Sequence, residues 1–123
     1  MSASSFRDLR VWQEAMRLTA EIYRSTTGFP KHELYGLSQQ IGRGRAVSVP
    51  SNIAEGKGHH SDKEFVCFLL HARGSLWELQ TQVLIAEELQ YFRNGEGARL
   101  LTLAEGVGRA LSGLINSMSG KAA

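Results

Sequence analysis

An apolar heptad pattern between residues 61 and 92 constrains the fold of this chain more than any other feature. Ser61 and Glu64 match a capping box, in which two side chains satisfy free backbone N–H groups at the start of a helix. The apolar residues that follow alternate spacings of four and three residues: Phe65, Leu69, Ala72, Leu76, Leu79, Val83 and Ala86. This pattern predicts a helix over residues 61–92 that crosses its neighbours at about 20°, as in a helical bundle.

The same segment carries a second set of apolar residues on another face of the predicted helix. Its members are Val66, Leu70, Trp77, Leu84 and Ile85. One bundle core needs a single apolar stripe from each helix, so a second stripe indicates that another surface is covered. We therefore predict a homo-oligomer with Val66, Leu70, Trp77 and Leu84 in its interface.

Three other segments have apolar residues at helical spacing, and we expect helices over residues 6–27, 33–56 and 96–118. The predicted core face of the first comprises Leu9, Trp12, Ala15, Met16, Thr19, Ile22 and Tyr23. Short connections that contain glycine separate the four segments. We therefore predict one all-α domain over residues 1–123, folded as an up-down-up-down four-helix bundle.

The outer face of the predicted first helix alternates in charge. Arg10, Glu14, Arg17, Glu21 and Arg24 follow one another at spacings of three or four residues. Such a face is either a basic binding stripe or a solvated surface with ion pairs between successive side chains. We favour the solvated surface because each arginine has a carboxylate neighbour.

Pro50 lies inside the helical pattern of the second segment. Proline lacks the N–H group that a helix needs, and its ring clashes with the carbonyl group four residues back. We predict one helix over residues 33–56 that bends near Pro50, where Ser48, Ser51 and Asn52 can bond to the freed backbone groups. Two shorter helices that meet at Pro50 are the alternative.

The composition is that of an ordinary globular protein, with 42% hydrophobic and 21% charged residues. The single cysteine, Cys67, cannot form an internal disulfide, which is typical of a reducing cytosol. Residues 1–5 lack the apolar core of a signal peptide, and no apolar run is long enough to span a bilayer. We expect a cytoplasmic protein that does not bind a membrane.

The sequence contains no pattern that is typical of an enzyme. A phosphate-binding loop, a zinc-ligand spacing and a Ser-His-Asp signature are all absent from it. His59 and His60 lie in a polar connection without a second group of ligands, and Cys67 and His71 lack an orienting carboxylate. We predict no catalytic residue, no metal and no cofactor. An enzyme that uses interior carboxylates or His71 is the alternative.

Residues 50–56, Pro50-Ser51-Asn52-Ile53-Ala54-Glu55-Gly56, resemble the signature of the four-helix-bundle proteins encoded in intervening sequences of bacterial large-subunit ribosomal RNA genes. Further stretches fit the same family in order: Phe6-Arg7-Asp8-Leu9, Val11-Trp12-Gln13, Phe29-Pro30-Lys31, Tyr35-Gly36-Leu37, Lys63-Glu64-Phe65, Phe68-Leu69, Gly74-Ser75-Leu76 and Glu78-Leu79. The resemblance implies an all-helical bundle, assembly into a ring of five and no known enzymatic activity. The accessory protein of diversity-generating retroelements is similar to this family and binds nucleic acid, so the resemblance suggests the same activity by analogy.

The chain departs from this family just before the signature. The family usually has two adjacent basic residues and two alanines there, whereas this chain has Ile41-Gly42-Arg43-Gly44-Arg45-Ala46, with one extra residue. A helix can absorb an extra residue as a π-bulge. In a regular helix, Arg43 and Arg45 would point about 200° apart.

The formal charge of +2 is too small by itself to identify a nucleic-acid binder. We nevertheless predict that a homo-oligomer, a pentamer by the resemblance, binds RNA or DNA without sequence preference. Its candidate contact residues are Arg43, Arg45, Lys57, Lys63 and Arg73. The alternative is a protein–protein interaction scaffold that does not bind nucleic acid, and salt-dependent binding distinguishes the two.

Overall fold

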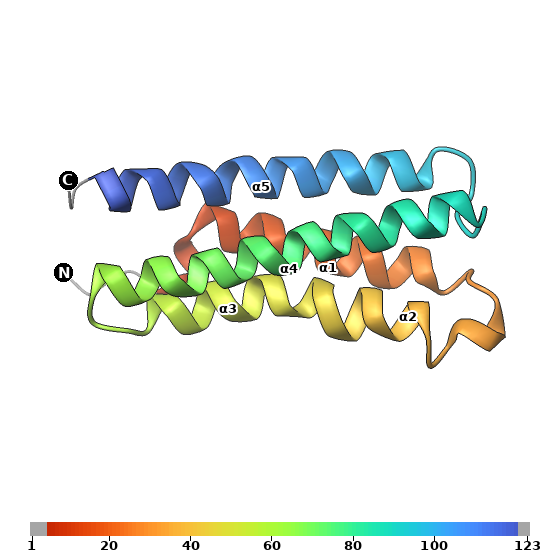
Figure 1. Cartoon of the computed structure of the whole chain (residues 1–123), viewed down its shortest axis with the longest axis horizontal. Helices are drawn as coiled ribbons and strands as arrows, with labels where there is room; N and C mark the ends of the chain where they lie inside the picture. The colour runs from red at the N-terminus through yellow and green to blue at the C-terminus, as the bar shows by residue number, and fades with distance from the viewer. Residues whose placement is uncertain (1–4, 121–123) are drawn as a thin grey trace.

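The structure is a computed structural model that describes residues 5–120. Its elements in chain order are the 3₁₀-helix η1 (Phe6–Asp8), α1 (Arg10–Thr26), the 3₁₀-helix η2 (Lys31–Glu33), α2 (Leu37–Gln39), the π-helix η3 (Gln40–Ala46), α3 (Val47–Lys57), α4 (Asp62–Glu88) and α5 (Glu96–Gly120). Elements α2, η3 and α3 follow one another directly, so the chain forms four helical rods that lie side by side (Figure 1). The predicted all-α four-helix bundle is confirmed.

Helix α4 packs against both α3 and α5. Helix α1 contacts the same two helices and completes the four-helix bundle. One apolar core runs between them. All seven residues of the predicted α4 stripe are buried, from Phe65 to Ala86. Ser61 caps α4 as predicted, because its hydroxyl accepts a hydrogen bond from the backbone N–H of Glu64 at 3.1 Å.

The end of α4 differs from the prediction, since the helix stops at Glu88 and not at residue 92. Gln90 adopts the left-handed backbone conformation, with φ of 59°. The N–H of Tyr91 then donates to the carbonyl of Ala86 at 3.0 Å, and the N–H of Gln90 donates to that of Glu87 at 2.9 Å. This pair of bonds is a Schellman motif, which usually has glycine at the position of Gln90.

The predicted core face of α1 is wrong in part. Met16 and Tyr23 are 44% and 43% exposed, whereas Val11 and Leu18 are buried instead. The buried residues of α1 are Val11, Ala15, Leu18, Ile22 and Ser25, which have the same alternating spacing as the α4 stripe. The helix also begins at Arg10 and not at residue 6, because Leu9 has extended backbone after the short turn η1.

The second rod contains a π-helix, as the extra residue among the glycines suggested. Seven residues, Gln40–Ala46, have π-helical geometry, and the N–H of Val47 donates to the carbonyl of Gly42, five residues back. The rod begins at Leu37, later than the predicted residue 33, and ends at Lys57. Helix α3 continues through Pro50, so the alternative of two helices that meet at Pro50 is wrong. A bend at Pro50 itself stays a prediction.

Helix α3 accommodates Pro50 with help from side chains. The carbonyl of Ala46, four residues before the proline, lies 3.0 Å from the Thr19 hydroxyl of α1, which can donate to it. The same hydroxyl lies 2.8 Å from the carbonyl of Ala15. The amide of Asn52 donates to the carbonyl of Ser48 at 2.8 Å, as predicted for this residue. Thr19 thus supplies a donor where Pro50 has none.

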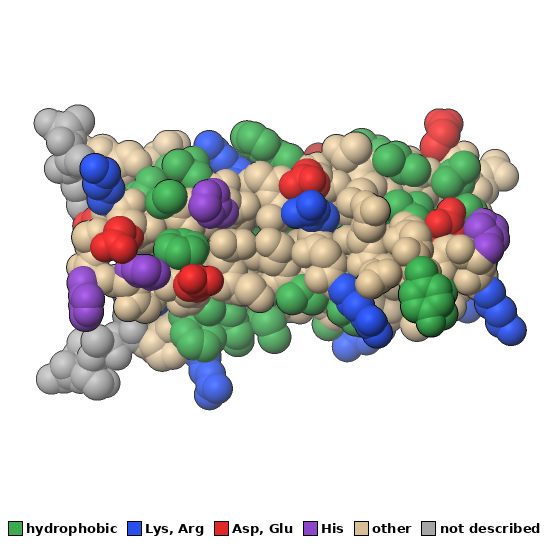
Figure 2. Space-filling view, turned by 60° about the horizontal axis from the view of Figure 1, so that its bottom comes forward, with side chains coloured by type: hydrophobic (Ala, Val, Ile, Leu, Met, Phe, Trp, Pro, Cys, Tyr) green, Lys and Arg blue, Asp and Glu red, His purple; other side chains and the backbone are tan. Residues whose placement is uncertain are grey.

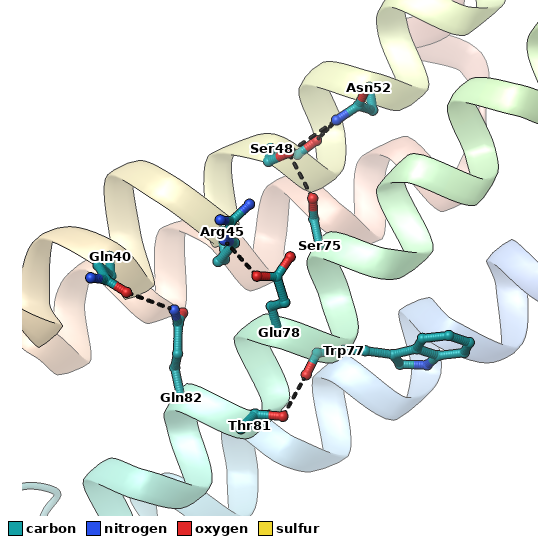
Figure 3. A network of polar contacts seen from close by, with 9 residues as sticks. All are labelled: Gln40, Arg45, Ser48, Asn52, Ser75, Trp77, Glu78, Thr81 and Gln82. Carbon is teal, nitrogen blue, oxygen red and sulfur yellow. Dashed lines mark hydrogen bonds and ion pairs between the residues drawn. The ribbon is translucent and has the colours of Figure 1, made fainter.

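Helices α3 and α4 approach each other closely at Gly56. A Cβ atom at this position would lie 2.6 Å from Cβ of Phe68, so the two backbones could not keep their spacing. Farther along the same interface the hydroxyls of Ser48 and Ser75 lie 2.8 Å apart, and the amide of Gln82 donates to that of Gln40 at 3.3 Å (Figure 3). These polar contacts join α4 to α3 at Ser48 and to η3 at Gln40.

An ion pair joins α1 to α5. The guanidinium of Arg99 donates two hydrogen bonds to the carboxylate of Glu21, at 2.7 and 3.0 Å. Arg24 lies 3.4 Å from the same carboxylate, and Arg10 pairs with Glu14 at 3.7 Å, as expected for a solvated charged face. The hydrogen bond from Arg99 holds the pKa of Glu21 below its ordinary value of 4.5.

Each helix within residues 5–120 is too short or too polar to span a lipid bilayer.

We expect Glu21→Gln to lower the melting temperature at neutral pH. A carboxylate with a lowered pKa stabilises the folded state above its unfolded pKa, and this contribution is lost as pH falls through the folded pKa. The difference between the parent and the variant should therefore shrink as pH falls below about 4.5. Glu14→Gln is the control, because its ion pair lies within one exposed helix face. A difference at Glu21 that persists unchanged to pH 3 would show that the ion pair is not its cause.

Candidate nucleic-acid and assembly surfaces

The five basic residues predicted to bind nucleic acid do not form one cluster. Arg43 and Arg45 belong to η3, Lys57 ends α3, Lys63 lies in the first turn of α4, and Arg73 lies near its middle. In Figure 2, Lys and Arg side chains are spread along this face of the molecule, with carboxylates and histidines between them. The contacts of each residue therefore decide which of them is available to a phosphate.

Arg45 is engaged by α4. Its Nε atom lies 3.4 Å from Oε2 of Glu78, and both side chains point into the space between η3 and α4 (Figure 3). The Arg45 side chain is 42% exposed, so the pair is screened by water and contributes little to stability. The carboxylate nevertheless offsets the charge that Arg45 would offer to a phosphate.

The Arg73 side chain also has partners within the chain, Trp77 and Ser112. Its guanidinium lies 5.1 Å from the ring centre of Trp77, a cation–π geometry, and its Nη1 atom lies 3.4 Å from the Ser112 hydroxyl of α5. Arg73 thus covers part of an exposed tryptophan and bridges α4 to α5.

Lys57 and Lys63 lie near the connection between α3 and α4. The Lys57 ammonium is 5.9 Å from the ring centre of Phe65, and Lys63 is exposed. In the same connection, Nδ1 of His59 lies within hydrogen-bond distance of Oε2 of Glu64, at 2.9 Å. The His59 ring stacks on the ring of Phe68. Residues 5–120 contain no group of three or more side chains placed to hold a metal ion.

Arg43 has a different environment. None of the ion pairs formed within residues 5–120 includes it, and it lines a hollow of about 620 Å³ at one end of the bundle. The hollow is bounded by the end of α1, the connection to α2, α2 itself and the start of η3. Its lining residues are Tyr23, Thr26, Thr27, Phe29, Pro30, Lys31, Leu34, Tyr35, Ser38, Gln39, Gly42 and Arg43. This lining contains two cations and no carboxylate.

The π-helix shapes this hollow. Gly42 is buried beneath the ring of Tyr23, and a Cβ atom there would lie 3.4 Å from the ring. The tyrosine can therefore lie against the backbone of η3. π-Helical segments are frequent at functional sites. Lys31, Tyr23 and Tyr35 are not identifiable as site residues from the sequence, because they come together only through the packing of separate elements. The helical spacing of α1 moreover predicts Tyr23 in the core.

The second apolar stripe of α4 is largely outside the core. Leu70, Trp77 and Leu84 are 42%, 57% and 54% exposed, whereas Val66 is half-buried and packs against the core. Ile85 and Leu89 extend the exposed apolar surface toward the end of the helix. Such a run of large apolar side chains along one helix is typical of a contact surface. We name Leu70, Trp77, Leu84 and Ile85 the outer stripe of α4.

Comparison with known proteins places this chain in a family. Residues 7–113 match the family described as 23S rRNA-intervening sequence protein. The fold is similar to the crystal structure of a protein of unknown function from the S23 ribosomal protein family of Bacteroides thetaiotaomicron, with a TM-score of 0.76 and 18% sequence identity. That alignment covers 85% of this chain and 97% of the other. No curated protein matches the sequence. The family match spans most of the chain and agrees with the fold, and the protein therefore belongs to the 23S rRNA-intervening sequence protein family.

Proposed function

We propose that this protein is a non-enzymatic homo-oligomer, a ring of five, that binds RNA or DNA without strong sequence preference. The observation that carries the proposal is the pairing of Arg43 with Lys31 around one hollow whose lining contains no carboxylate. Two cations that line one hollow, neither of them in an ion pair formed within residues 5–120, favour an anion. In a ring, every subunit would repeat this pair around the axis.

The outer stripe of α4 supports assembly. A closed ring requires that two different surfaces of each subunit meet. Helices α1 and α4 each pack mainly against α3 and α5, so their outer faces point away from each other. The outer stripe of α4 and the exposed Met16 of α1 therefore offer apolar surfaces on opposite sides of the bundle. This arrangement suits a head-to-tail contact.

We expect binding to weaken steeply with salt, because phosphate contacts release condensed counterions. The double change Lys31→Gln and Arg43→Gln should reduce the slope of log affinity against log salt. The expected reduction is about 0.9 per lost contact with duplex DNA and about 0.7 per contact with a single strand. Fluorescence anisotropy with duplex DNA, single-stranded DNA and structured RNA, from low to physiological salt, measures this slope.

Arg45→Gln is the matched control, because it removes the same charge from the same helix but from a residue already paired with Glu78. It should change the slope less than Arg43→Gln does. Equal slopes for the parent and the double variant would place the phosphate contacts elsewhere, and Lys57 and Lys63 would be tested next.

The alternative function is a protein–protein interaction scaffold, which the outer stripe of α4 also favours. A scaffold would assemble in the same way but would bind none of the three nucleic acids, even at low salt. That result would exclude the nucleic-acid proposal.

A further inference from the structure

The hollow beside η3 combines an apolar floor with exposed tyrosines. Phe29 is buried and held by the rings of Tyr91 and Phe92, whose centres lie 5.2 and 5.1 Å away. Above this floor Tyr23 is 43% exposed and Tyr35 is 84% exposed. Tyrosines with this much free surface contribute little to a core. They leave aromatic faces available to a flat ligand.

The cations lie on the same hollow as the tyrosines. Lys31 and Arg43 both line the hollow, Lys31 from η2 and Arg43 from η3. At the corresponding end of the molecule in Figure 2, Lys and Arg side chains flank exposed hydrophobic groups. A ligand that matches the hollow is therefore flat and aromatic in one part and anionic in another.

An unpaired nucleotide has these two parts. Its base can stack on tyrosine, and the phosphates on either side of it can meet Lys31 and Arg43. A base within a duplex is stacked between its neighbours and cannot enter a hollow of this kind without being flipped out. A volume of about 620 Å³ is in the usual range of sites that hold a small ligand, and so is large enough for one base.

We propose that this hollow binds an unpaired base of a single-stranded nucleic acid, stacked on Tyr35 and Tyr23, with its flanking phosphates on Arg43 and Lys31. This inference rests on the proposed function and specifies that the bound nucleic acid is single-stranded. Stacking accepts every base, so weak sequence preference follows from the same geometry. A second copy of this chain is the competing occupant, but an apolar contact between subunits would leave the two cations without anions.

The test compares Tyr35→Ala with Tyr35→Phe in the full chain. Tyr35 is mostly exposed, so neither change should alter the melting temperature or the oligomer mass. Tyr35→Ala should weaken binding of a short oligo(dT) strand roughly 5- to 160-fold, the range for one base–aromatic stack, and Tyr35→Phe should retain it. Affinity for a duplex of the same length and the salt slope should not change, because neither depends on the stack.

Crosslinking gives an independent measurement. A single strand that contains 5-iodouracil should crosslink to Tyr35 or Tyr23 on irradiation, as located by peptide mass spectrometry. If the parent binds single strands but Tyr35→Ala binds them equally well, the base hollow is wrong while the proposed function stands. If the parent binds no nucleic acid, both proposals fail. A change in oligomer mass in Tyr35→Ala would assign the hollow to the subunit interface and overturn the inference.

Discussion

Replacing Leu79 with alanine is expected to lower the free energy of unfolding by about 2–5 kcal/mol. The Leu79 side chain is completely buried in the middle of α4, within the core that the four rods share. Shortening it removes favourable burial of apolar atoms, and the surrounding side chains can only partly fill the cavity. The reduction should therefore exceed the transfer free energy of the lost atoms. Denaturant and thermal melts measure it.

Leu34→Ala is the matched control, since it makes the same chemical change at a leucine that is 58% exposed. Substitutions at exposed positions usually stay within about 0.5 kcal/mol. Similar losses in the two variants, or no loss at Leu79, would mean that the heptad stripe of α4 does not form the core.

Leu84→Asp is expected to separate the proposed oligomer into single chains of 13.6 kDa. Leu84 is exposed in the single subunit, so a carboxylate there is solvated and should leave the fold intact. In an apolar interface the same carboxylate would be buried without a partner, at a cost of several kcal/mol per contact. Light scattering after size exclusion measures the mass, and circular dichroism checks that the helices persist.

Ser51→Asp adds the same charge on the exposed side of α3 and should leave the mass unchanged. An unchanged mass in Leu84→Asp would place the interface away from the outer stripe of α4. A parent protein that stays a single chain at high concentration would contradict the oligomer altogether.

Local signals explain which parts of the fold were predictable. The start of α4 and its buried stripe follow from a cap and a spacing that lie within one segment, and both are confirmed. The end of α4 was misplaced because Gln90, without the usual glycine, adopts the left-handed conformation. Periodicity alone therefore continued the helix to residue 92, where Tyr91 and Phe92 instead pack against Phe29.

The errors on α1 and at the candidate site have a common cause. The prediction correctly included Ala15 and Ile22, but large apolar side chains such as Met16 and Tyr23 drew it toward their side of the helix. It therefore omitted Val11 and Leu18, which are buried. An exposed tyrosine and a buried one look alike in a sequence. The hollow was not predictable for the same reason, because its lining comes from four segments whose approach depends on packing.

The π-helix η3 has a consequence for comparing this chain with its relatives. The extra residue expected from the family resemblance falls within Gln40–Ala46, where the helix is π-helical, while Leu37 before it and Val49 and Ile53 after it all pack in or against the core. Residue-by-residue equivalence therefore holds before and after η3 but breaks within it. A relative without the insertion can share Val49, Ile53 and Gly56 in place and still direct its basic pair toward other neighbours. One residue more or less within η3 would therefore change where the proposed contact residue Arg43 points, while the buried side chains of α3 stay in place.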